Sequence, residues 1–153
     1  NEKNLKPWKT CREVISRYEN FNFTEKQIKV KPGGKHNSLL KKIPAGNNYL
    51  YFTKKRGYKN PLFGWKTRYW TFLLKLDPNR PAWTIQANFS TNQGPFHWNN
   101  RFLNICEIKK LQTINMNHKI AGNFKEKWRQ IGNAFPTKMA KIFADKIRIH
   151  QFS

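Results

Sequence analysis

A few polar side chains in this sequence are suited to reading the edges of DNA bases. Arginine can donate two hydrogen bonds to guanine, and glutamine can pair in the same bidentate way with adenine. The residues of these types that stand out are Arg68, Arg80, Gln86 and Arg101. Each could instead be an exposed charge or a structural hydrogen-bond donor. As a set, we expect them to supply at least one direct contact with DNA, and Lys66 belongs to the run of cations beside them.

The cysteines and histidines form no pattern typical of a metal centre or a disulfide framework. Cys11 and Cys106 lie far apart in the sequence, and His36, His118 and His150 have no partners at zinc spacing. We therefore expect no metal. His97 lies between Phe96 and Trp98, and we interpret it as a structural residue or a donor to a phosphate.

The charge is the strongest feature of the composition. The 153 residues contain 30 Lys and Arg against 8 Asp and Glu, a formal net charge of +22. An AT-rich genome would raise the Lys content but would also supply acidic residues, which are scarce here. The excess therefore predicts a polyanionic partner, and we expect double-stranded DNA. No apolar run reaches about 18 residues and no signal peptide is visible, so we expect no membrane and a cytoplasmic, nucleoid-associated protein of bacterial or phage-like origin.

Three segments have the signals of helices. Thr10 with Glu13, and Asn104 with Glu107, form the capping-box pattern that begins a helix. The last segment begins at Pro136, and apolar residues at helical spacing follow it: Met139, Ile142, Phe143 and Ile147. These patterns predict a short helix after Thr10, a helix through about residue 113 and a terminal amphipathic helix.

Aromatic and β-branched runs at 49–52, 68–74 and 83–87 predict short strands. Residues 19–48, 88–100 and 114–131 are interpreted as loop, with Gly33-Gly34 as a turn rather than a cofactor loop. The fold class expected from these elements is a mixed, loop-rich α+β unit. The aromatic residues could stack on bases or fill a small core, and the core is favoured: Tyr69, Trp70, Trp83, Phe96 and Trp98.

Residues 129–136 read R-Q-I-G-N-A-F-P. This resembles the last shared motif of cytosine-5 DNA methyltransferases, approximately R-Q-I-G-N-A-V-P, at seven of eight positions. Residues 101–112 resemble the penultimate motif, although Cys106 replaces an arginine and Ile114-Asn115 replaces the usual Phe-Pro. Residues 81–85 resemble the P-x-x-T-I core of the family's target-recognition region, and residues 7–15 resemble the stretch that precedes it. The four stretches occur in family order.

The resemblance implies a division of the chain and a partner. It assigns 1–18 to a connecting helix, 19–100 to target recognition, 101–128 to the penultimate motif, and 129–153 to the last motif and the terminal helix. In the family this helix packs on a Rossmann-like catalytic domain. The Pro-Cys nucleophile, the Glu-Asn-Val segment and the glycine loop for S-adenosylmethionine are absent from this sequence. The chain is therefore expected to be inactive alone and to act with a catalytic half.

The resemblance also implies roles for two groups of residues. Thr84 and Ile85 would lie near the point where the target cytosine leaves the duplex, because chemistry on the base requires its extrusion. Gly132, Asn133 and Ala134 would help to close the S-adenosylmethionine pocket. The alternative for Thr84 and Ile85 is an ordinary strand. The alternative for Gly132, Asn133 and Ala134 is a turn at the entry of a helix.

Three functions remain open at this stage. The leading one is sequence-specific DNA recognition in a DNA cytosine-5 methyltransferase, with the catalytic half as a separate subunit or as the front of one polypeptide. The second is a stand-alone DNA-binding protein or restriction-system recognition subunit derived from the family. The third is a nonspecific basic DNA binder, whose affinity would not depend on sequence at constant salt.

Overall fold

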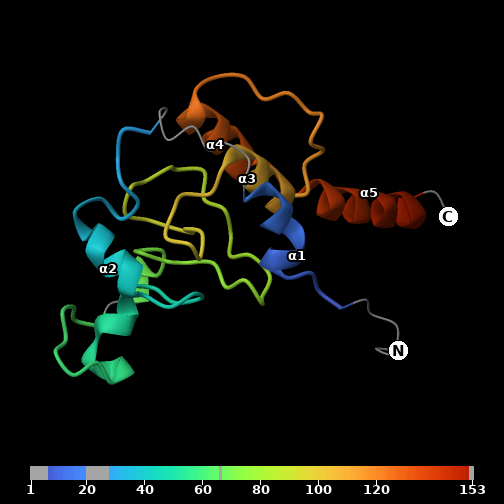
Figure 1. Cartoon of the computed structure of the whole chain (residues 1–153). Helices are drawn as coiled ribbons and strands as arrows, with labels where there is room; N and C mark the ends of the chain where they lie inside the picture. The colour runs from blue at the N-terminus through green and yellow to red at the C-terminus, as the bar shows by residue number, and fades with distance from the viewer. Residues whose placement is uncertain (1–6, 20–27, 66, 152–153) are drawn as a thin grey trace.

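The computed structural model describes residues 7–19, 28–65 and 67–151. Five α-helices occur in this part of the chain: α1 (Cys11–Ile15), α2 (Asn37–Lys42), α3 (Ile105–Leu111), α4 (Phe124–Asn133) and α5 (Thr137–Gln151). Short 3-10 turns join them: η2 (Ser16–Tyr18), η4 (Gly34–His36), η5 (Tyr49–Phe52), η6 (Lys54–Arg56) and η7 (Thr67–Tyr69). Long irregular segments occupy the centre of the molecule (Figure 1).

The expected α+β architecture is wrong for the residues described here, which contain no named strand and no sheet. Strand-type pairing is limited to two isolated bridges, Phe72 with Gln93 and Lys75 with Phe96. The run at 49–52 forms η5 because the Asn48 side chain accepts a hydrogen bond from the Leu50 amide at 3.1 Å. In the run at 68–74, Leu73 has a φ of 52°, which interrupts an extended backbone. High aromatic content indicated burial correctly but not strand pairing.

The two capping boxes are confirmed. Thr10 and Glu13 exchange hydrogen bonds at the start of α1, and Asn104 and Glu107 do so at the start of α3. The terminal helix is also confirmed as α5. Two helices were missed, α2 within the expected 19–48 loop and α4 within the expected 114–131 loop. α4 begins at a third capping box, Asn123 with Glu126.

The first of two hydrophobic cores gathers α1, α3 and α4 around the central segments. α1 contacts α3, and α3 contacts α4. The buried side chains of this first core are Cys11, Ile15, Leu76, Ile85, Leu103, Ile108, Ile114, Phe124, Trp128 and Ile131. Residues of the expected recognition region, Leu76 and Ile85, therefore pack directly with residues of the shared motifs.

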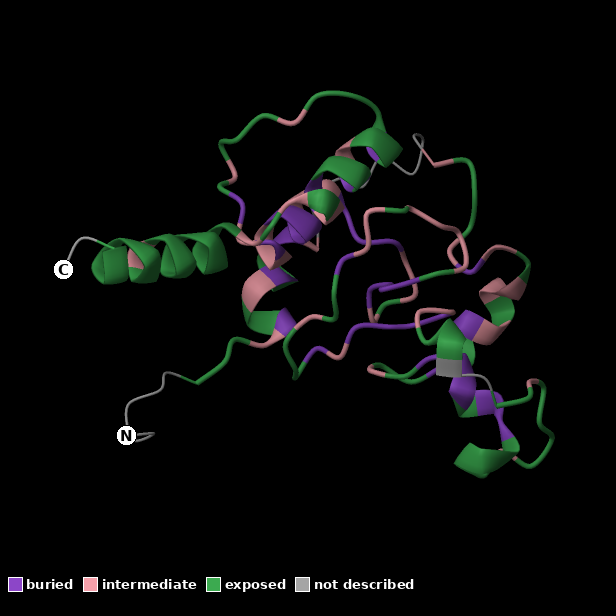
Figure 2. Ribbon diagram, turned by 180° about the vertical axis from the view of Figure 1, so that it is seen from behind, coloured by how far each residue is buried: buried purple, intermediate pink, exposed green. Residues whose placement is uncertain are grey.

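The second core lies beneath α2 and η5. Its buried side chains are Leu40, Ile43, Tyr49, Leu50, Phe52, Leu73, Phe96 and Phe102. Phe89 packs against both cores, with ring centroids 5.0 Å from Phe102 and 5.4 Å from Trp128. The two cores are thus continuous through this ring, and Figure 2 shows buried residues both in the helices and in the central segments.

α5 extends away from the body of the molecule, and none of its residues is buried (Figures 1 and 2). Hydrogen bonds tether its first turn to Thr113. The Thr137 hydroxyl donates to the Thr113 carbonyl, and the Lys138 amide donates to the Thr113 hydroxyl at 3.0 Å. The helix is therefore fixed at one end and open to solvent along its length.

Candidate nucleic-acid interface

The P-A-W-T-I segment and the last motif meet at the junction between residues 86–87 and α4. The indole Nε1–H of Trp128 donates a hydrogen bond of 2.8 Å to the Gln86 carbonyl. A Cβ placed on Gly132 would lie 2.5 Å from the Ala87 Cα and 2.7 Å from the Gln86 carbonyl oxygen. Only glycine permits this approach, because the neighbouring atoms are backbone. The two motifs therefore form one rigid unit.

Within that segment the side chains differ in their burial. Ile85 is buried in the first core, whereas Thr84 and Trp83 are exposed and Gln86 is half-buried. The backbone of residues 86–87 is held by Trp128 and Gly132 rather than by a neighbouring strand. Ile85 thus anchors the segment, and Thr84 is free to meet a partner.

The other exposed candidates lie on two separate segments. Arg68 is exposed, with its guanidinium carbon 4.8 Å from the Tyr69 ring centroid. Arg80 is also exposed, and its Nε lies 3.7 Å from the Asp77 carboxylate. The rings of Trp70 and Trp83 meet edge to face, with their centroids 5.8 Å apart. Because Trp83 precedes Thr84, this contact brings the end of the 68–70 segment near Thr84. Lys66 lies outside the described residues.

Arg101 serves the interior in this structure. Its guanidinium makes hydrogen bonds of 2.8 and 2.6 Å to the two carboxylate oxygens of Glu107, which is fully buried. Glu107 in turn accepts from the Asn104 amide, at 2.8 Å. The arginine of the penultimate motif therefore neutralises the carboxylate that caps α3, and little of its side chain reaches the surface.

His97 is also internal, with no exposed surface. Its Nδ1 accepts from the Asn99 amide at 3.1 Å, so a neutral ring carries its proton on Nε2. That nitrogen lies 3.5 Å from a Glu19 carboxylate oxygen and 3.7 Å from one of Glu107. Burial lowers the pKa of His97 to about 3, and the nearby Arg101 cation adds to the shift. His97 was interpreted as a structural residue or as a donor to a phosphate. Its buried position fits the structural role.

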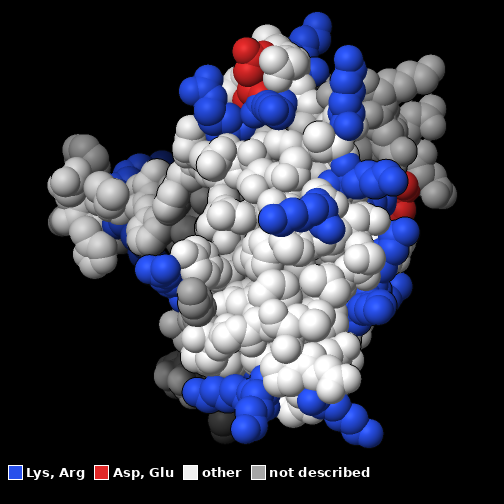
Figure 3. Space-filling view, turned by 90° about the vertical axis from the view of Figure 1, so that its left-hand side faces the viewer, with Lys and Arg blue, Asp and Glu red and all other residues white. Residues whose placement is uncertain are grey.

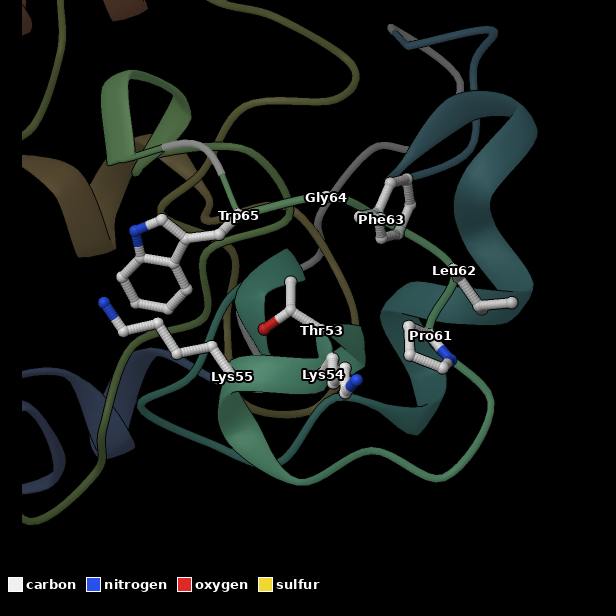
Figure 4. A pocket seen from close by; sticks show the side chains of 8 residues that line it. All are labelled: Thr53, Lys54, Lys55, Pro61, Leu62, Phe63, Gly64 and Trp65. Atoms are coloured by element: carbon white, nitrogen blue, oxygen red, sulfur yellow. The ribbon is translucent and has the colours of Figure 1, made fainter.

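Exposed aromatic side chains and cations alternate over residues 54–70. Lys55 Nζ lies 4.2 Å from the Trp65 ring centroid, and the Arg56 guanidinium lies 5.9 Å from it. Lys55 and Trp65 line a shallow open recess of about 680 Å³, in which the two side chains lie next to each other (Figure 4). Cations against an aromatic face are attracted to the ring quadrupole. The combination is typical of surfaces that contact nucleic-acid backbone and bases.

The aromatic candidates divide between surface and core. Tyr69, Trp70 and Trp83 are exposed, whereas Phe96 is buried and Trp98 packs against the first core. The expectation that these rings fill a core is therefore correct for two of the five. Trp65, which no sequence pattern singled out, belongs with the exposed group.

Basic side chains cover much of the α2 side of the molecule. Lys and Arg surround a central uncharged area on this face, and acidic side chains are visible only near its edges (Figure 3). Among the described acidic residues, Glu13, Asp77, Glu107, Glu126 and Asp145 each accept a hydrogen bond within the chain. The formal net charge of +22 already includes the eight acidic residues, so the electrostatic field around the chain is strongly positive.

The Gly132-Asn133-Ala134 turn ends α4. Asn133 is exposed, while Gly132 and Ala134 are half-buried. The Ala134 amide donates to the Ile131 carbonyl at 3.1 Å, which closes the helix before Phe135. Asn133 and Phe135 are therefore presented to the outside by a turn whose position the Gly132–Ala87 contact fixes.

Two further findings concern classes of site. Among the described residues, no group of three or more His, Cys, Asp or Glu side chains is arranged to hold a metal ion. In the same part of the chain, no helix combines the length and apolar character needed to cross a bilayer.

Comparisons with known proteins agree with the motif order. Residues 2–148 match the family described as C-5 cytosine-specific DNA methylase. A relative from Streptomyces achromogenes, the type II methyltransferase M.SacI, is 39% identical over 119 residues, which cover 71% of this chain and 30% of the relative. The chain thus spans under a third of that protein's length. No solved structure shows significant similarity to it. The family match covers nearly all of the sequence, and the chain belongs to the C-5 cytosine-specific DNA methylase family.

Proposed function

We propose that this chain is the target-recognition part of a DNA cytosine-5 methyltransferase. It would grip and read double-stranded DNA while a catalytic half transfers a methyl group to carbon 5 of cytosine. The observation that supports this most directly is the Trp70–Trp83 contact, which joins an exposed aromatic and basic segment to the exposed Thr84. Both lie on a chain with a net charge of +22.

In this proposal, residues 19–100 carry the DNA contacts. Arg68, Arg80 and Thr84 face the duplex, with the half-buried Gln86 near Thr84, and Lys66 is a further candidate that lies outside the described residues. Ile85, His97 and Arg101 are positioning residues, because their side chains lie in the interior or bind Glu107. Phosphate contacts from the cations would set the register, and the remaining polar groups would read base edges.

The cofactor-side role falls to Gly132, Asn133 and Ala134. Family membership implies S-adenosylmethionine as the methyl donor. The turn fits a position at the rim of a pocket, because Asn133 is exposed and Gly132 is held against Ala87. The chemistry itself would rest with the half that carries the Pro-Cys and Glu-Asn-Val motifs.

α5 would join the chain to that half. Its exposed apolar side chains are Met139, Ile142, Phe143, Ile147 and Ile149, and Phe135 precedes them. An apolar surface of this kind on a helix without a buried residue is typical of a protein interface. The 101–128 segment would link it to the recognition region.

A stand-alone DNA-binding protein derived from the family is the second candidate. The replacement of an arginine by Cys106 and the Ile114-Asn115 pair depart from the penultimate motif, and the chain has two packed cores of its own. Such a protein would need no cofactor-side turn and no apolar α5.

A methylation assay separates the two. The chain is mixed with a family catalytic half that contains Pro-Cys and Glu-Asn-Val, duplex DNA and S-adenosylmethionine labelled in its methyl group. We expect label transfer from the mixture and none from either half alone. Transfer by this chain alone would contradict the proposal. Tight sequence-specific DNA binding with no transfer from any mixture would favour the stand-alone protein.

A further inference from the structure

A second recess lies beside the one in Figure 4 and shares the wall formed by residues 62–64. Its volume is about 580 Å³, within the usual range for sites that hold small molecules. Phe63, Phe72 and Tyr69 contribute aromatic walls, and Arg68 and Gln93 contribute polar groups. Neither the family match nor the motifs assign this recess a role.

The aromatic walls are fixed relative to one another. Phe63 and Phe72 meet edge to face with centroids 5.9 Å apart, and Tyr49 contacts both rings, at 5.7 and 5.5 Å. Tyr49 is buried, so the cluster extends into the second core. The recess therefore has a preformed apolar base and does not depend on a loop closing over it.

Backbone hydrogen bonds fix the polar side in the same way. The Leu73 amide donates to the Asn92 carbonyl at 2.9 Å, and the Gly94 amide donates to the Thr71 carbonyl at 2.8 Å. These bonds join the segment that carries Phe72 to the segment that carries Gln93. Both Gln93 and Arg68 are exposed, so their polar ends are available to a ligand.

The ligand chemistry follows from these groups. Flat aromatic walls favour a planar ring, and an amide can pair with the donor and acceptor edge of a nucleobase. A guanidinium suits phosphate, and the field of the chain attracts anions. We propose that this recess binds one nucleotide, with the base against its aromatic walls, the base edge at Gln93 and the phosphate at Arg68.

Two sources could supply such a nucleotide, a free mononucleotide or a base turned out of a DNA strand. The second source deepens the DNA role and rests on the proposed function. It means that the recognition region holds an extrahelical base of its own, separate from the cytosine presented to the catalytic half. Binding of a free mononucleotide requires only the recess and does not depend on the proposed function.

The free-nucleotide arm uses nuclear magnetic resonance of the whole chain labelled with ¹⁵N. Deoxyguanosine monophosphate, deoxycytidine monophosphate, deoxyguanosine and inorganic phosphate are titrated separately. We expect saturable shifts of the Phe72 and Gln93 amides with the nucleotides, weaker binding of the nucleoside and no matching shifts with phosphate. The absence of saturable shifts, or the same shifts with phosphate alone, would overturn the proposal.

Variants test the assigned groups. Arg68→Met and Gln93→Leu should each weaken nucleotide binding at least tenfold. Lys59→Met removes one charge from an exposed position outside the recess and serves as the control, with binding within about twofold because it retains the aromatic walls and both polar groups. Equal losses in Lys59→Met and Arg68→Met would mean that net charge alone binds the ligand, which contradicts the recess. Circular dichroism of each variant confirms that the fold is retained.

The DNA arm compares a perfect duplex with the same duplex carrying one bulged base. We expect at least fivefold tighter binding of the bulged duplex, and loss of this preference in Gln93→Leu. Duplex binding with no preference and no nucleotide shifts would overturn the recess but leave the DNA role standing. Nucleotide shifts without duplex binding would support the recess and contradict the proposed function.

Discussion

The indole nitrogen of Trp128 lies 2.8 Å from the backbone carbonyl oxygen of Gln86 and donates a hydrogen bond to it. The two residues are 42 positions apart and belong to different motifs of the family. Since Trp128 is buried in the first core, this bond fixes the segment that carries Thr84 to the helix that ends at the cofactor-side turn. Residues 81–87 and the last motif are thus coupled mechanically.

Replacing Trp128 by Phe tests this coupling. Phe retains most of the apolar contact but leaves the buried Gln86 carbonyl without its donor, so we expect the free energy of unfolding to fall by about 1–3 kcal/mol. Urea denaturation of the two proteins measures the difference. Trp8→Phe, at an exposed position, is the control and should be neutral. An unchanged midpoint in Trp128→Phe would show that the bond does not hold the segment.

Gly132→Ala tests the close approach of α4 to residues 86–87. The added methyl would clash with backbone atoms 2.5 and 2.7 Å away, and backbone cannot rotate aside. We expect a loss of about 1–3 kcal/mol, the usual range for overpacking, and a shift of the 84–87 amides in nuclear magnetic resonance spectra. Gly64→Ala is a matched control, because no atom lies within 4 Å of the added carbon and its φ is not in the left-handed region. Equal stability of the two variants would contradict the proposed constraint.

The buried position of His97 predicts that the fold loses stability in acid. Its pKa in the folded chain is lowered to about 3 by burial, against 6.5 in an unfolded chain. Below about pH 6.5 the unfolded state binds one more proton, so stability is complete above that pH and falls as the pH drops toward 3. The slope should be about 1.4 kcal/mol per pH unit from this residue. Denaturation between pH 4 and 8 measures it, and His97→Gln should flatten the curve. If stability depends on pH in the same way in the wild type and in His97→Gln, then other groups cause the loss of stability in acid.

Phe143→Asp tests the role of α5. The side chain is 56% exposed, so the free energy of unfolding of the chain alone should change by less than about 0.5 kcal/mol. Association with a catalytic half should be lost, because an aspartate in an apolar interface is left unpaired. Lys138→Asp places the same residue at an exposed polar position of the helix, and we expect it to associate normally. Binding is measured by analytical ultracentrifugation, and normal association of Phe143→Asp would remove α5 from the interface.

Arg101 and Glu107 illustrate how a motif residue can be identified correctly while its environment is not. The Asn104–Glu107 spacing predicted the start of α3, since a capping box involves residues three apart. The position of Arg101 six residues before Glu107 gave no indication that the two side chains form a bidentate pair. Phe102 and Leu103, which lie between the two in sequence, are both buried, so the packing of the core places the arginine beside the carboxylate.

By itself the sequence determined the family, the strongly positive net charge, and the three helices with local signals. These properties are encoded within a few residues or in the composition as a whole. The local capping box at Asn123 and Glu126 also marks the start of α4. Among the described residues, the absence of paired strands and the exposure of Trp65 beside Lys55 were decided only by the tertiary structure. Their physical reason is the same in each case: an aromatic side chain can be buried by any neighbour, and only the packing of distant segments determines which rings fill a core. That packing placed Thr84 and Arg68 at the surface and His97 and Arg101 inside.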